Sequence, residues 1–552
     1  MKSNSTSNTL TGIAKAWPPL AWGLSLLLCA PIIALLVVAF SDYSDNFRHL
    51  YDTVLFIYMR NSLILLLGVC TMAVIWGVPS AWLISRFEFP ARRILRWALL
   101  LPMAMPAYLV AFVYTDLLDY AGPIQIALRD WFGWQNASDY WFVDMRTMGG
   151  AIFVLSLVFS PYVYWLVSLN FSEQSQSLIH AARLLGRSEA QVFYKVMLPL
   201  ARPAIAVGCT LVGMETLADY GTVAYFSVWH MTTAVYDTWL QLFDLPLAAK
   251  LSSLLLLFVV VLITLEKRGR RHMRFYSERQ TPMLRVPLTG AKAWLATAWC
   301  ALVVLLGFAL PALWLSTQAV RYFADTDWPA FARMGIDTLK VAFSVASMAV
   351  IIAFILQGYA RLRPKRGNWT ARLASLGYAI PGTVLAIGVL IVTTSIDHAI
   401  NAFTNASGYG NVGLLLSGTL FAMALAFSCR FAAIGIGAVD AGMSKMPHSY
   451  DDCAYLNGYS HSETARKIWL PLLRNSLLTA FLLIFLESMK ELSAALLLRP
   501  FNVELLSTYI YQYMTAERFE VAALPALLMV VIGLPPVLLL TYSMDKKNAQ
   551  LP

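Results

Sequence analysis

The chain has 552 residues, of which 59% are hydrophobic and only 13% are charged. Soluble proteins contain about 45–50% apolar and about 25% charged residues, so this composition excludes an ordinary soluble protein and indicates a polytopic membrane protein. The formal net charge of +10 does not indicate nucleic-acid binding, because the basic residues lie between apolar segments, where the positive-inside rule places them. We therefore expect membrane lipid around the chain and no nucleic-acid partner.

Cysteine and histidine spacing gives no sign of a metal site or a disulfide framework. The six cysteines show no CxxC spacing, and five of them lie within apolar segments, where cysteine packs as a small hydrophobic side chain. The seven histidines form no HxxxH or HExxH cluster. Residues 1–17 are polar and precede an apolar segment that is too long for a signal peptide, so we expect a cytosolic N-terminal tail.

Twelve apolar segments follow one another along the chain, each long enough to cross about 30 Å of hydrocarbon as a helix. The sequence therefore predicts an all-α integral membrane protein with about twelve transmembrane helices. The predicted spans are residues 18–40, 61–84, 95–118, 149–171, 201–227, 246–265, 292–315, 338–360, 374–396, 412–435, 473–497 and 523–544.

Basic residues cluster in every second loop and at the end of the chain. The remaining loops mix both signs of charge and carry many acidic and aromatic residues; they are residues 41–60, 119–147, 228–245, 316–337, 397–411 and 498–522. The positive-inside rule then puts the basic loops and both termini in the cytoplasm, and the mixed loops on the outer side.

One polar segment occurs twice, as HAARLLGRSEAQVFYKVMLP at 180–199 and DCAYLNGYSHSETARKIWLP at 452–471. The separation of the two copies is close to half the length of the chain. The matching positions are His180, Ala181, Ala182, Gly186, Leu198 and Pro199 in the first copy, and Asp452, Cys453, Ala454, Gly458, Leu470 and Pro471 in the second.

The halves also match outside this segment. PAYLVA at 106–111 aligns with PGTVLA at 381–386, and the apolar segments 61–87 and 337–363 align at a similar offset. Two halves with the same span order and orientation form a parallel repeat. We therefore expect two six-helix domains, residues 18–265 and 291–552, joined by a basic linker at 266–290.

The repeated segment predicts two short helices joined at its glycine. Apolar residues at helical spacing precede Gly186, and a glycine ends a helix well because it adopts the left-handed conformation. Ser188 with Gln191, and Ser460 with Glu463, have the spacing of a capping box that starts the next helix. The following Leu-Pro marks entry into the next span, since proline is tolerated in a first helical turn. Such a bent helix pair at the membrane surface can dock in a groove of a partner.

This spacing resembles the cytoplasmic EAA loop of binding-protein-dependent ABC importer permeases, which reads Glu-Ala-Ala, three residues, Gly, nine residues, Ile, one residue, Leu-Pro. The chain has His180 in place of the first Glu, and Asp452-Cys453-Ala454 in place of the second Glu-Ala-Ala. The resemblance covers nearly the whole chain and implies two fused permease domains in a bacterial inner membrane. It implies that the loops are coupling helices on two copies of a cytosolic ATPase, and that a periplasmic substrate-binding protein docks on the outer loops.

The cargo is narrowed by two further segments, ETLADYGTVAYF at 215–226 and ESMKELSAALLLRPFN at 487–502, which resemble ferric-iron importer permeases. Fused thiamine and aminoethylphosphonate importer permeases share much of this pattern, so these two cargoes stay open. No GxxxxGK[ST] motif occurs, so ATP is bound by the partner ATPase, and we expect neither an enzymatic activity nor a cofactor in this chain.

Four acidic residues within the fifth and eleventh spans are candidates for the translocation pathway: Glu215, Asp219, Glu487 and Glu491. Each pair is spaced i, i+4, which places both acids on one face of a helix. Charges inside a membrane face a cavity or a partner by default, and carboxylate oxygens suit hard metal cations. The alternative is structural: Lys490 can pair with Glu487 at i, i+3, and carboxylates can join helices or cap broken ones.

Two other classes of protein stay open at this stage. A secondary transporter with parallel halves explains the membrane acids as a proton relay but leaves the duplicated cytosolic segment unexplained. A membrane receptor or assembly scaffold predicts no vectorial transport. Uptake energised by ATP while the proton gradient is collapsed distinguishes an ABC importer from both.

Overall fold

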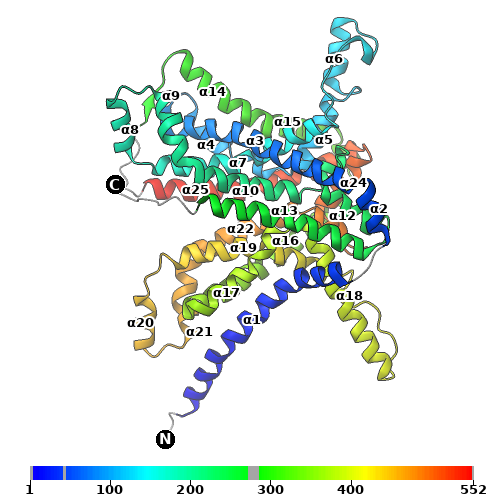
Figure 1. Ribbon diagram of the computed structural model, residues 1–552, viewed down its shortest axis with the longest axis vertical. Coiled ribbons are helices and arrows are strands. Elements are labelled where there is room, and N and C mark those ends of the chain that lie inside the picture. The colour runs from blue at the N-terminus through cyan, green and yellow to red at the C-terminus, as the bar shows by residue number, and fades with distance from the viewer. Residues whose placement is uncertain (1–3, 42–44, 271–284, 550–552) are drawn as a thin grey trace. The chain divides into compact units, whose positions relative to one another are not determined.

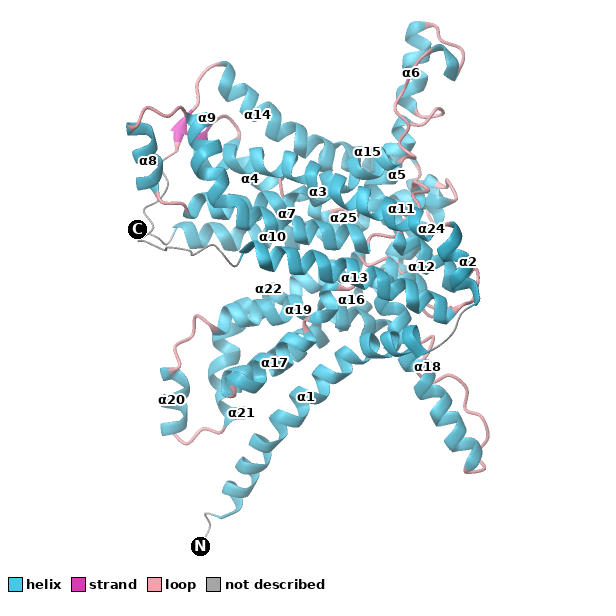
Figure 2. Cartoon of the chain, viewed as in Figure 1, coloured by secondary structure: helices cyan, strands magenta, loops and turns pink. Residues whose placement is uncertain are grey.

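The computed structural model describes residues 4–41, 45–270 and 285–549, and most of them are helical (Figures 1 and 2). In this part of the chain, eleven helices are long and apolar enough to cross a membrane, and one bent helix pair brings the number to twelve. Each of the twelve predicted spans overlaps one of these. The predicted fold class, an all-α integral membrane protein, is confirmed.

The helices pack into two compact units, each built from three stretches of the chain. Unit 1 comprises the described residues of 1–46, 235–253 and 328–509, and unit 2 those of 47–234, 254–327 and 510–552. The chain passes from one unit to the other at five points. Four of them lie within helices, α2 (Asp45–Thr53), α12 (Met231–Leu240), α13 (Leu245–Arg270) and α24 (Leu506–Thr515), and the fifth lies between Asp327 and Trp328.

Each unit has its own long helices and short connecting elements. Unit 1 contains α1 (Asn4–Ser41), α16 (Trp328–Leu362), α17 (Pro364–Ala374), α18 (Gly382–Ala406), α19 (Leu420–Met443), α20 (Ser449–Leu456), α21 (His461–Thr464), α22 (Leu470–Lys490) and α23 (Ser493–Leu498). Unit 2 contains α3 (Leu55–Arg86), α4 (Arg92–Ala98), α5 (Ala107–Leu118), α6 (Pro123–Phe132), α7 (Met148–Glu173), α8 (Gln176–Leu184), α9 (Glu189–Val192), α10 (Leu198–Ala218), α11 (Gly221–Tyr225), α14 (Ala291–Val304), α15 (Leu310–Arg321) and α25 (Phe519–Ala549).

The first helix of each sequence half packs in the unit formed mainly by the other half. In unit 1, α1 runs along α17 and α18 (Figure 1), where Ser25 Oγ donates to the Thr370 carbonyl (2.9 Å). In unit 2, α14 and α15 pack against α3, α4 and α5, and Trp299 Nε1 donates to Ser80 Oγ (3.1 Å). The proposed boundaries of the sequence repeats stay a prediction, and residues 271–284 of the predicted linker lie outside the described part of the chain.

Small residues allow the central helices of each unit to approach closely. A Cβ on Gly77 of α3 would lie 2.9 Å from the Tyr164 nitrogen of α7, and one on Gly208 of α10 would lie 3.1 Å from Val163 Cα. In unit 1 the corresponding contact between α19 and α16 pairs Gly435 with Ala353. Such small-residue contacts are typical of helices packed in a membrane, where close van der Waals packing drives association.

The predicted third span, residues 95–118, is not one straight helix. It consists of a bent pair, Arg92–Ala104 and Ala107–Phe132, whose axes differ by 95°. The break lies at Met105 (φ −108°, ψ 127°), which precedes Pro106, and proline forces the preceding residue out of the helical region. Ile380, before Pro381, is extended for the same reason (φ −97°, ψ 130°), so the ninth span begins at Gly382.

The Leu-Pro pairs also differ from the expectation that proline occupies a first turn. One turn of π-helix precedes each pair, at η3 (Phe193–Met197) and η7 (Ala465–Trp469), and the helix continues through it from the preceding short helix. The same turn, η4 (Leu305–Ala309), precedes Leu310–Pro311. A widened turn accommodates proline inside a helix because it relieves the clash between the ring and the carbonyl one turn earlier.

Candidate functional site

The first repeated segment folds as α8, a turn and α9, which we call the first elbow (residues 176–192). Gly186 adopts φ +76° and its N–H donates to the Arg183 carbonyl (2.9 Å), which satisfies one carbonyl at the end of α8. Ser188 Oγ accepts from the Gln191 N–H (3.3 Å), while Gln191 Oε1 accepts from the Ser188 N–H (3.2 Å). The predicted glycine cap and capping box are both confirmed.

The second elbow, α20, a turn and α21 (residues 449–464), repeats this geometry in unit 1. Gly458 adopts φ +77° and donates to the Tyr455 carbonyl (3.0 Å). Ser460 and Glu463 form the reciprocal capping box, with N–H to oxygen distances of 3.3 and 2.9 Å.

The predicted coupling residues occupy matching places in the two elbows and in the helices that follow. His180, Ala181, Gly186, Asp452, Cys453, Gly458, Leu470 and Pro471 are exposed, Ala182, Leu198 and Pro199 are half-buried, and Ala454 is buried. Each set is therefore divided between one elbow and the start of the long helix that follows it, α10 or α22. Their role in coupling stays a prediction.

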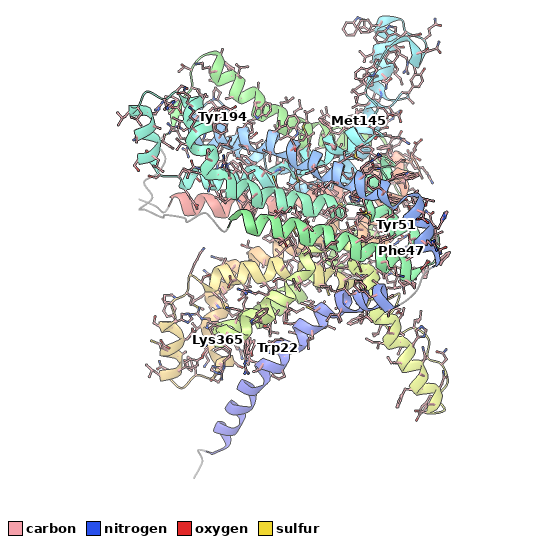
Figure 3. All side chains as sticks on the ribbon, viewed as in Figure 1. Trp22, Phe47, Tyr51, Met145, Tyr194 and Lys365 are labelled. Atoms are coloured by element: carbon pink, nitrogen blue, oxygen red, sulfur yellow. The ribbon has the colours of Figure 1, made fainter. Side chains whose placement is uncertain are left out.

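Both elbows expose apolar side chains at equivalent positions. Leu184 is 89% exposed, and Leu456, its equivalent in the second copy, is 88% exposed. Leu178 and Tyr450 form a second equivalent pair, with exposed fractions of 51% and 48%. Tyr194, labelled beside the first elbow in Figure 3, is 66% exposed. Exposed large apolar side chains of this kind are typical of an interaction site.

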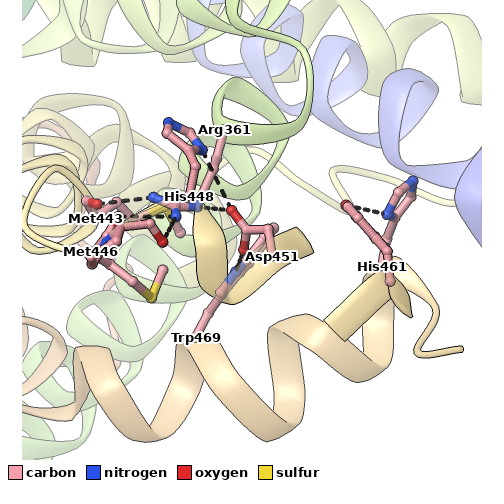
Figure 4. A network of polar contacts seen from close by, with 9 residues as sticks. Arg361, Met443, Met446, His448, Asp451, His461 and Trp469 are labelled. Carbon is pink, nitrogen blue, oxygen red and sulfur yellow. Dashed lines mark hydrogen bonds and ion pairs between the residues drawn. The ribbon is translucent and has the colours of Figure 1, made fainter. Parts of the chain in front are cut away.

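A buried ion pair holds the second elbow to the membrane helices of unit 1 (Figure 4). Arg361, at the end of α16, donates from Nε to Asp451 Oδ2 (2.7 Å), and the two side chains are 6% and 10% exposed. Its remaining donors reach the Met443 and Met446 carbonyls (both 3.0 Å). Trp469 Nε1 donates to the other carboxylate oxygen of Asp451 (2.7 Å). Asp451 thus joins α16, α20 and the start of α22.

The first elbow is held by a different carboxylate. Arg86, at the end of α3 and buried, reaches Glu189 of α9 through Nε (3.4 Å) and Nη2 (3.3 Å), and Arg183 pairs with the same carboxylate. In the sequence, Arg86 and Arg361 belong to the basic clusters of the positive-inside pattern, and that pattern does not indicate their partners. Both arginines end the second span of their half, and this shared position is the signal that could have revealed them.

The second elbow carries one further polar contact, between Tyr455 and His461. The Tyr455 hydroxyl lies 2.8 Å from His461 Nδ1. Burial and the nearby carboxylates of Asp451 and Asp452 raise the pKa of Tyr455, so the hydroxyl keeps its proton and can donate it to the imidazole. This contact ties α20 to α21 across the glycine turn.

The acids of the fifth and eleventh spans do not share helical faces as predicted. Helix α10 ends at Ala218, and Asp219 is extended (ψ 128°); helix α22 ends at Lys490, and Glu491 is extended (ψ 112°). Each carboxylate instead accepts from the N–H groups that begin the next short helix. Asp219 Oδ1 accepts from Thr222 (2.9 Å), and Glu491 Oε1 accepts from Ala494 (3.1 Å). The i, i+4 inference failed because a helix break separates each pair.

The two breaks match down to single hydrogen bonds. Thr232 Oγ1 donates to the Asp219 carbonyl (3.0 Å), and Ser507 Oγ, its equivalent in the second half, donates to the Glu491 carbonyl (3.1 Å). In both units, a hydroxyl of the second span of the half binds the start of the helix that follows the break. Ser62 Oγ of α3 accepts from the Met231 N–H of α12 (3.0 Å), and Thr338 Oγ1 of α16 accepts from the Leu506 N–H of α24 (2.8 Å). The breaks are therefore part of the architecture that the two halves share.

The second break includes a buried arginine. Arg430 of α19 pairs with Glu491 (3.0 Å), and the two side chains are 9% and 7% exposed. A Cβ on Gly382 would overlap Glu491 Oε1 and lie 2.6 Å from Arg430 Nη1, so a larger residue there would require the pair to shift. The predicted pairing of Lys490 with Glu487 is confirmed at 3.0 Å. Among the described residues, no three His, Cys, Asp or Glu side chains gather as a metal site requires.

The predicted outer loop 119–147 forms an ordered hairpin, which we call the outer hairpin, and in Figure 1 its helix α6 stands away from the rest of unit 2. Trp134 stacks on Phe132 (4.7 Å between centroids) and on Tyr140 (4.6 Å), so α6 and the returning chain are held together. Arg129 donates to the Tyr120 carbonyl (2.8 Å) and the Tyr140 hydroxyl (3.1 Å).

The outer surface of this hairpin is rich in exposed aromatic side chains. Trp131 and Trp141 are each 85% exposed. A cavity of about 350 Å³ lies at its base, lined by Tyr140, Asp144 and Met145 among others, and Figure 3 labels Met145 there. The Asp139 carboxylate accepts from two backbone N–H groups of its own turn, which lowers its pKa. The hairpin is thus a preformed surface with large side chains directed outward.

Two regions of the chain match one protein family. The model of the binding-protein-dependent transport system inner membrane component matches residues 71–274 and again residues 346–547. The two matches lie in the two halves that the repeat distinguishes, and each contains one elbow.

Several curated proteins are similar to the chain. The Fe(3+)-transport system permease protein FbpB 2 of Haemophilus influenzae is 24% identical over 495 residues, which cover 88% of this chain and 90% of that protein. The ferric transport system permease protein FbpB of Actinobacillus pleuropneumoniae is 22% identical and covers 86% of this chain and 69% of its own length. The molybdenum transport system permease protein ModB of Escherichia coli is 29% identical over 169 residues, 30% of this chain and 70% of ModB.

Proposed function

Because the chain belongs to the inner membrane components of binding-protein-dependent transport systems, as an ABC importer permease with two fused domains, we propose that it carries ferric iron. The observation that carries this proposal is the length of the similarity: two ferric transport permeases align over 88% and 86% of the chain. The molybdenum permease aligns over less than a third of it. Thiamine and aminoethylphosphonate are the alternative cargoes.

The family works with an ATPase and a substrate-binding protein, and we propose that two ATPase copies dock on the two elbows. The matched exposure of Leu184 and Leu456 supports this assignment, because apolar side chains that protrude from a helix pair can fill a groove of a partner. His180 and Asp452, at the positions of the family's glutamate, are exposed and differ in charge type. The two elbows therefore contact their ATPase copies in the same way through the apolar side chains of Leu184 and Leu456, and not through an ion pair common to both.

The outer hairpin is the proposed contact for the periplasmic binding protein. Its exposed Trp131 and Trp141 are residues that contribute strongly to protein interfaces, and its aromatic stack holds them in place before binding. This assignment places the hairpin in the periplasm and the elbows and both termini in the cytoplasm. The sidedness follows the distribution of basic residues in the sequence.

Glu215, Asp219, Glu487 and Glu491 remain the proposed pathway residues. The helix breaks at Asp219 and Glu491 support this role, since irregular backbone at membrane depth is tolerated where it is buried in protein or lines a cavity. The Arg430–Glu491 pair makes the second half less able to bind a cation at this level. We therefore expect Glu215 and Asp219 to contribute more to cation passage than Glu487 and Glu491.

The experiment that tests the cargo is uptake in proteoliposomes that contain the chain, its ATPase and its binding protein. Radiolabelled ferric iron should accumulate when ATP is enclosed and the proton gradient is collapsed, while thiamine and aminoethylphosphonate should not compete. If either compound is transported and iron is not, the protein is an ABC importer for that compound and the ferric-iron proposal is wrong.

The double variant Glu215→Gln with Asp219→Asn tests the pathway residues. It should slow iron uptake and leave ATPase binding intact; normal uptake would show that these acids are not part of the pathway.

A further inference from the structure

A second repeated motif behaves differently in the two halves. Ala-Lys-Ala-Trp begins the first span of each half, at residues 14–17 and 291–294. In unit 1, Trp17 contacts the second elbow: its Nε1 donates to Ser462 Oγ (3.4 Å), and its ring packs edge-on against Trp469 (6.3 Å between centroids). In unit 2, the equivalent Trp294 is 66% exposed.

The packing around Trp17 is specific. A Cβ on Gly358 of α16 would lie 2.6 Å from Trp17 Cζ3 and 3.2 Å from Trp469 Cζ3, so only a glycine at this position leaves room for both rings. Trp469 is fully buried and donates to Asp451, which pairs with Arg361. A continuous series of contacts therefore runs from α1 through two tryptophans to the second elbow and α16, all within unit 1.

The first elbow lacks the groups that make these contacts. With Gly186 aligned on Gly458, Trp469 corresponds to Met197, Asp451 to Ile179 and Ser462 to Ala190. None of these three side chains of the first copy can form the corresponding hydrogen bonds. The first elbow is attached to α3 through the Glu189 carboxylate of α9. Helix α8 reaches that attachment through Arg183, which pairs with Glu189, and its buried Ile179 contributes apolar contacts.

We propose that Trp17 is a positioning residue that braces the second elbow, so that the two ATPase-docking elbows are mechanically unequal. The braced elbow transmits ATPase movement to α1 and α16 directly, whereas the first elbow yields at α8. Transport then depends more on the ATPase copy at the second elbow. This inference rests on the proposed docking of ATPase subunits on the elbows, but the bracing itself is a property of this chain alone.

The first test measures amide hydrogen exchange on the purified full-length chain without any partner. Trp17→Ala should accelerate exchange in residues 449–464 about 10-fold and leave residues 176–192 unchanged. Trp17→Phe, which keeps ring packing but loses the donor to Ser462, should give a smaller acceleration. Trp294→Ala, the matched control, should alter neither elbow. Unchanged exchange in residues 449–464 of both Trp17 variants overturns the proposal.

The second test uses the complete transporter and measures iron transported per ATP hydrolysed, together with the number of ATPase copies bound. Trp17→Ala should still bind two copies but transport about 3- to 10-fold less iron per ATP, and Trp294→Ala should match the wild type. An equal ratio in all three proteins overturns the inequality of the elbows. If wild-type chain binds no ATPase, the proposed docking fails, while the exchange experiment still decides whether Trp17 braces the elbow.

Discussion

The glycines at the two elbow turns are fixed by backbone conformation rather than by space. Gly186 and Gly458 have φ of +76° and +77°, and a Cβ at either would meet no atom within 4 Å. Gly186→Ala with Gly458→Ala should therefore cost only the left-handed backbone penalty, about 1–2 kcal/mol at each site. If this distorts the docking surface, affinity for the ATPase falls about 5- to 30-fold per elbow, which co-purification at graded ATPase concentrations measures.

The outer hairpin supplies a matched control for this pair. Gly133 ends α6 with φ +72°, and a Cβ there would also meet no atom within 4 Å. Gly133→Ala carries the same backbone cost but lies far along the chain from either elbow, so it should leave ATPase binding unchanged. Equal losses in the elbow and hairpin variants would mean that the effect comes from general instability rather than from the coupling surface.

Gly382 is constrained in the opposite way, by lack of space. Gly382→Ala would place a methyl group against the ends of the Arg430 and Glu491 side chains, so the pair must shift. Strained packing of this kind typically costs about 1–3 kcal/mol. The corresponding residue of the first half is already Ala107, beside a break that has the shorter Asp219. Ala107→Gly should therefore cost less than about 1 kcal/mol. Thermal unfolding in detergent compares the two variants, and a Gly382→Ala protein as stable as Ala107→Gly would contradict the argument.

Residues whose role depends on backbone geometry could be predicted from the sequence, and residues whose role depends on a distant partner could not. Gly186 and Ser188 act within a few residues of themselves, so their spacing alone predicts the turn and the cap. Asp451 acts through Arg361, which lies far away along the chain, and nothing local distinguishes it from the exposed Asp452. The breaks after Ala218 and Lys490 were missed because hydrophobicity continues through them while the helix does not.

At the scale of single elements, the outer hairpin depends on one aromatic stack. Trp134→Ala removes two ring contacts, each of which contributes about 0.5–1.5 kcal/mol beyond its area, so the preformed surface should loosen. We expect stimulation of ATP hydrolysis by the binding protein to require about 10-fold more binding protein, with basal hydrolysis unchanged.

Two further variants separate contact from rigidity in this hairpin. Trp131→Ala removes an 85% exposed side chain and should weaken the binding protein without disturbing the Trp134 stack. Trp369→Ala, on α17 and 59% exposed, removes a comparable surface tryptophan from a different element and should have no effect on stimulation. If Trp131→Ala and Trp134→Ala both leave stimulation unchanged, the binding protein docks on another outer loop.

At the scale of the whole molecule, the sequence repeat and the packing units are different divisions of the same chain. The repeat predicts two similar halves, and the two family matches agree with that division. Packing instead places α1 of the first half with the helices of the second. Periodicity along a sequence reports which faces of a helix are apolar but not which neighbour covers them, so this exchange of first helices could not be read from the sequence.

The exchange predicts how a divided chain assembles. When residues 1–270 and 285–552 are co-expressed as separate polypeptides, they should co-purify as a stable complex, because each packing unit needs helices from both.

Deleting residues 4–41 removes α1, whose Leu28 and Leu35 are buried and whose Pro31 lies against Gly388 of α18. Unit 1 should then unfold at least about 5 °C earlier. Deleting α14 and α15 should weaken unit 2 in the same way. Halves that purify separately, each as stable as the complex, would contradict the exchanged packing.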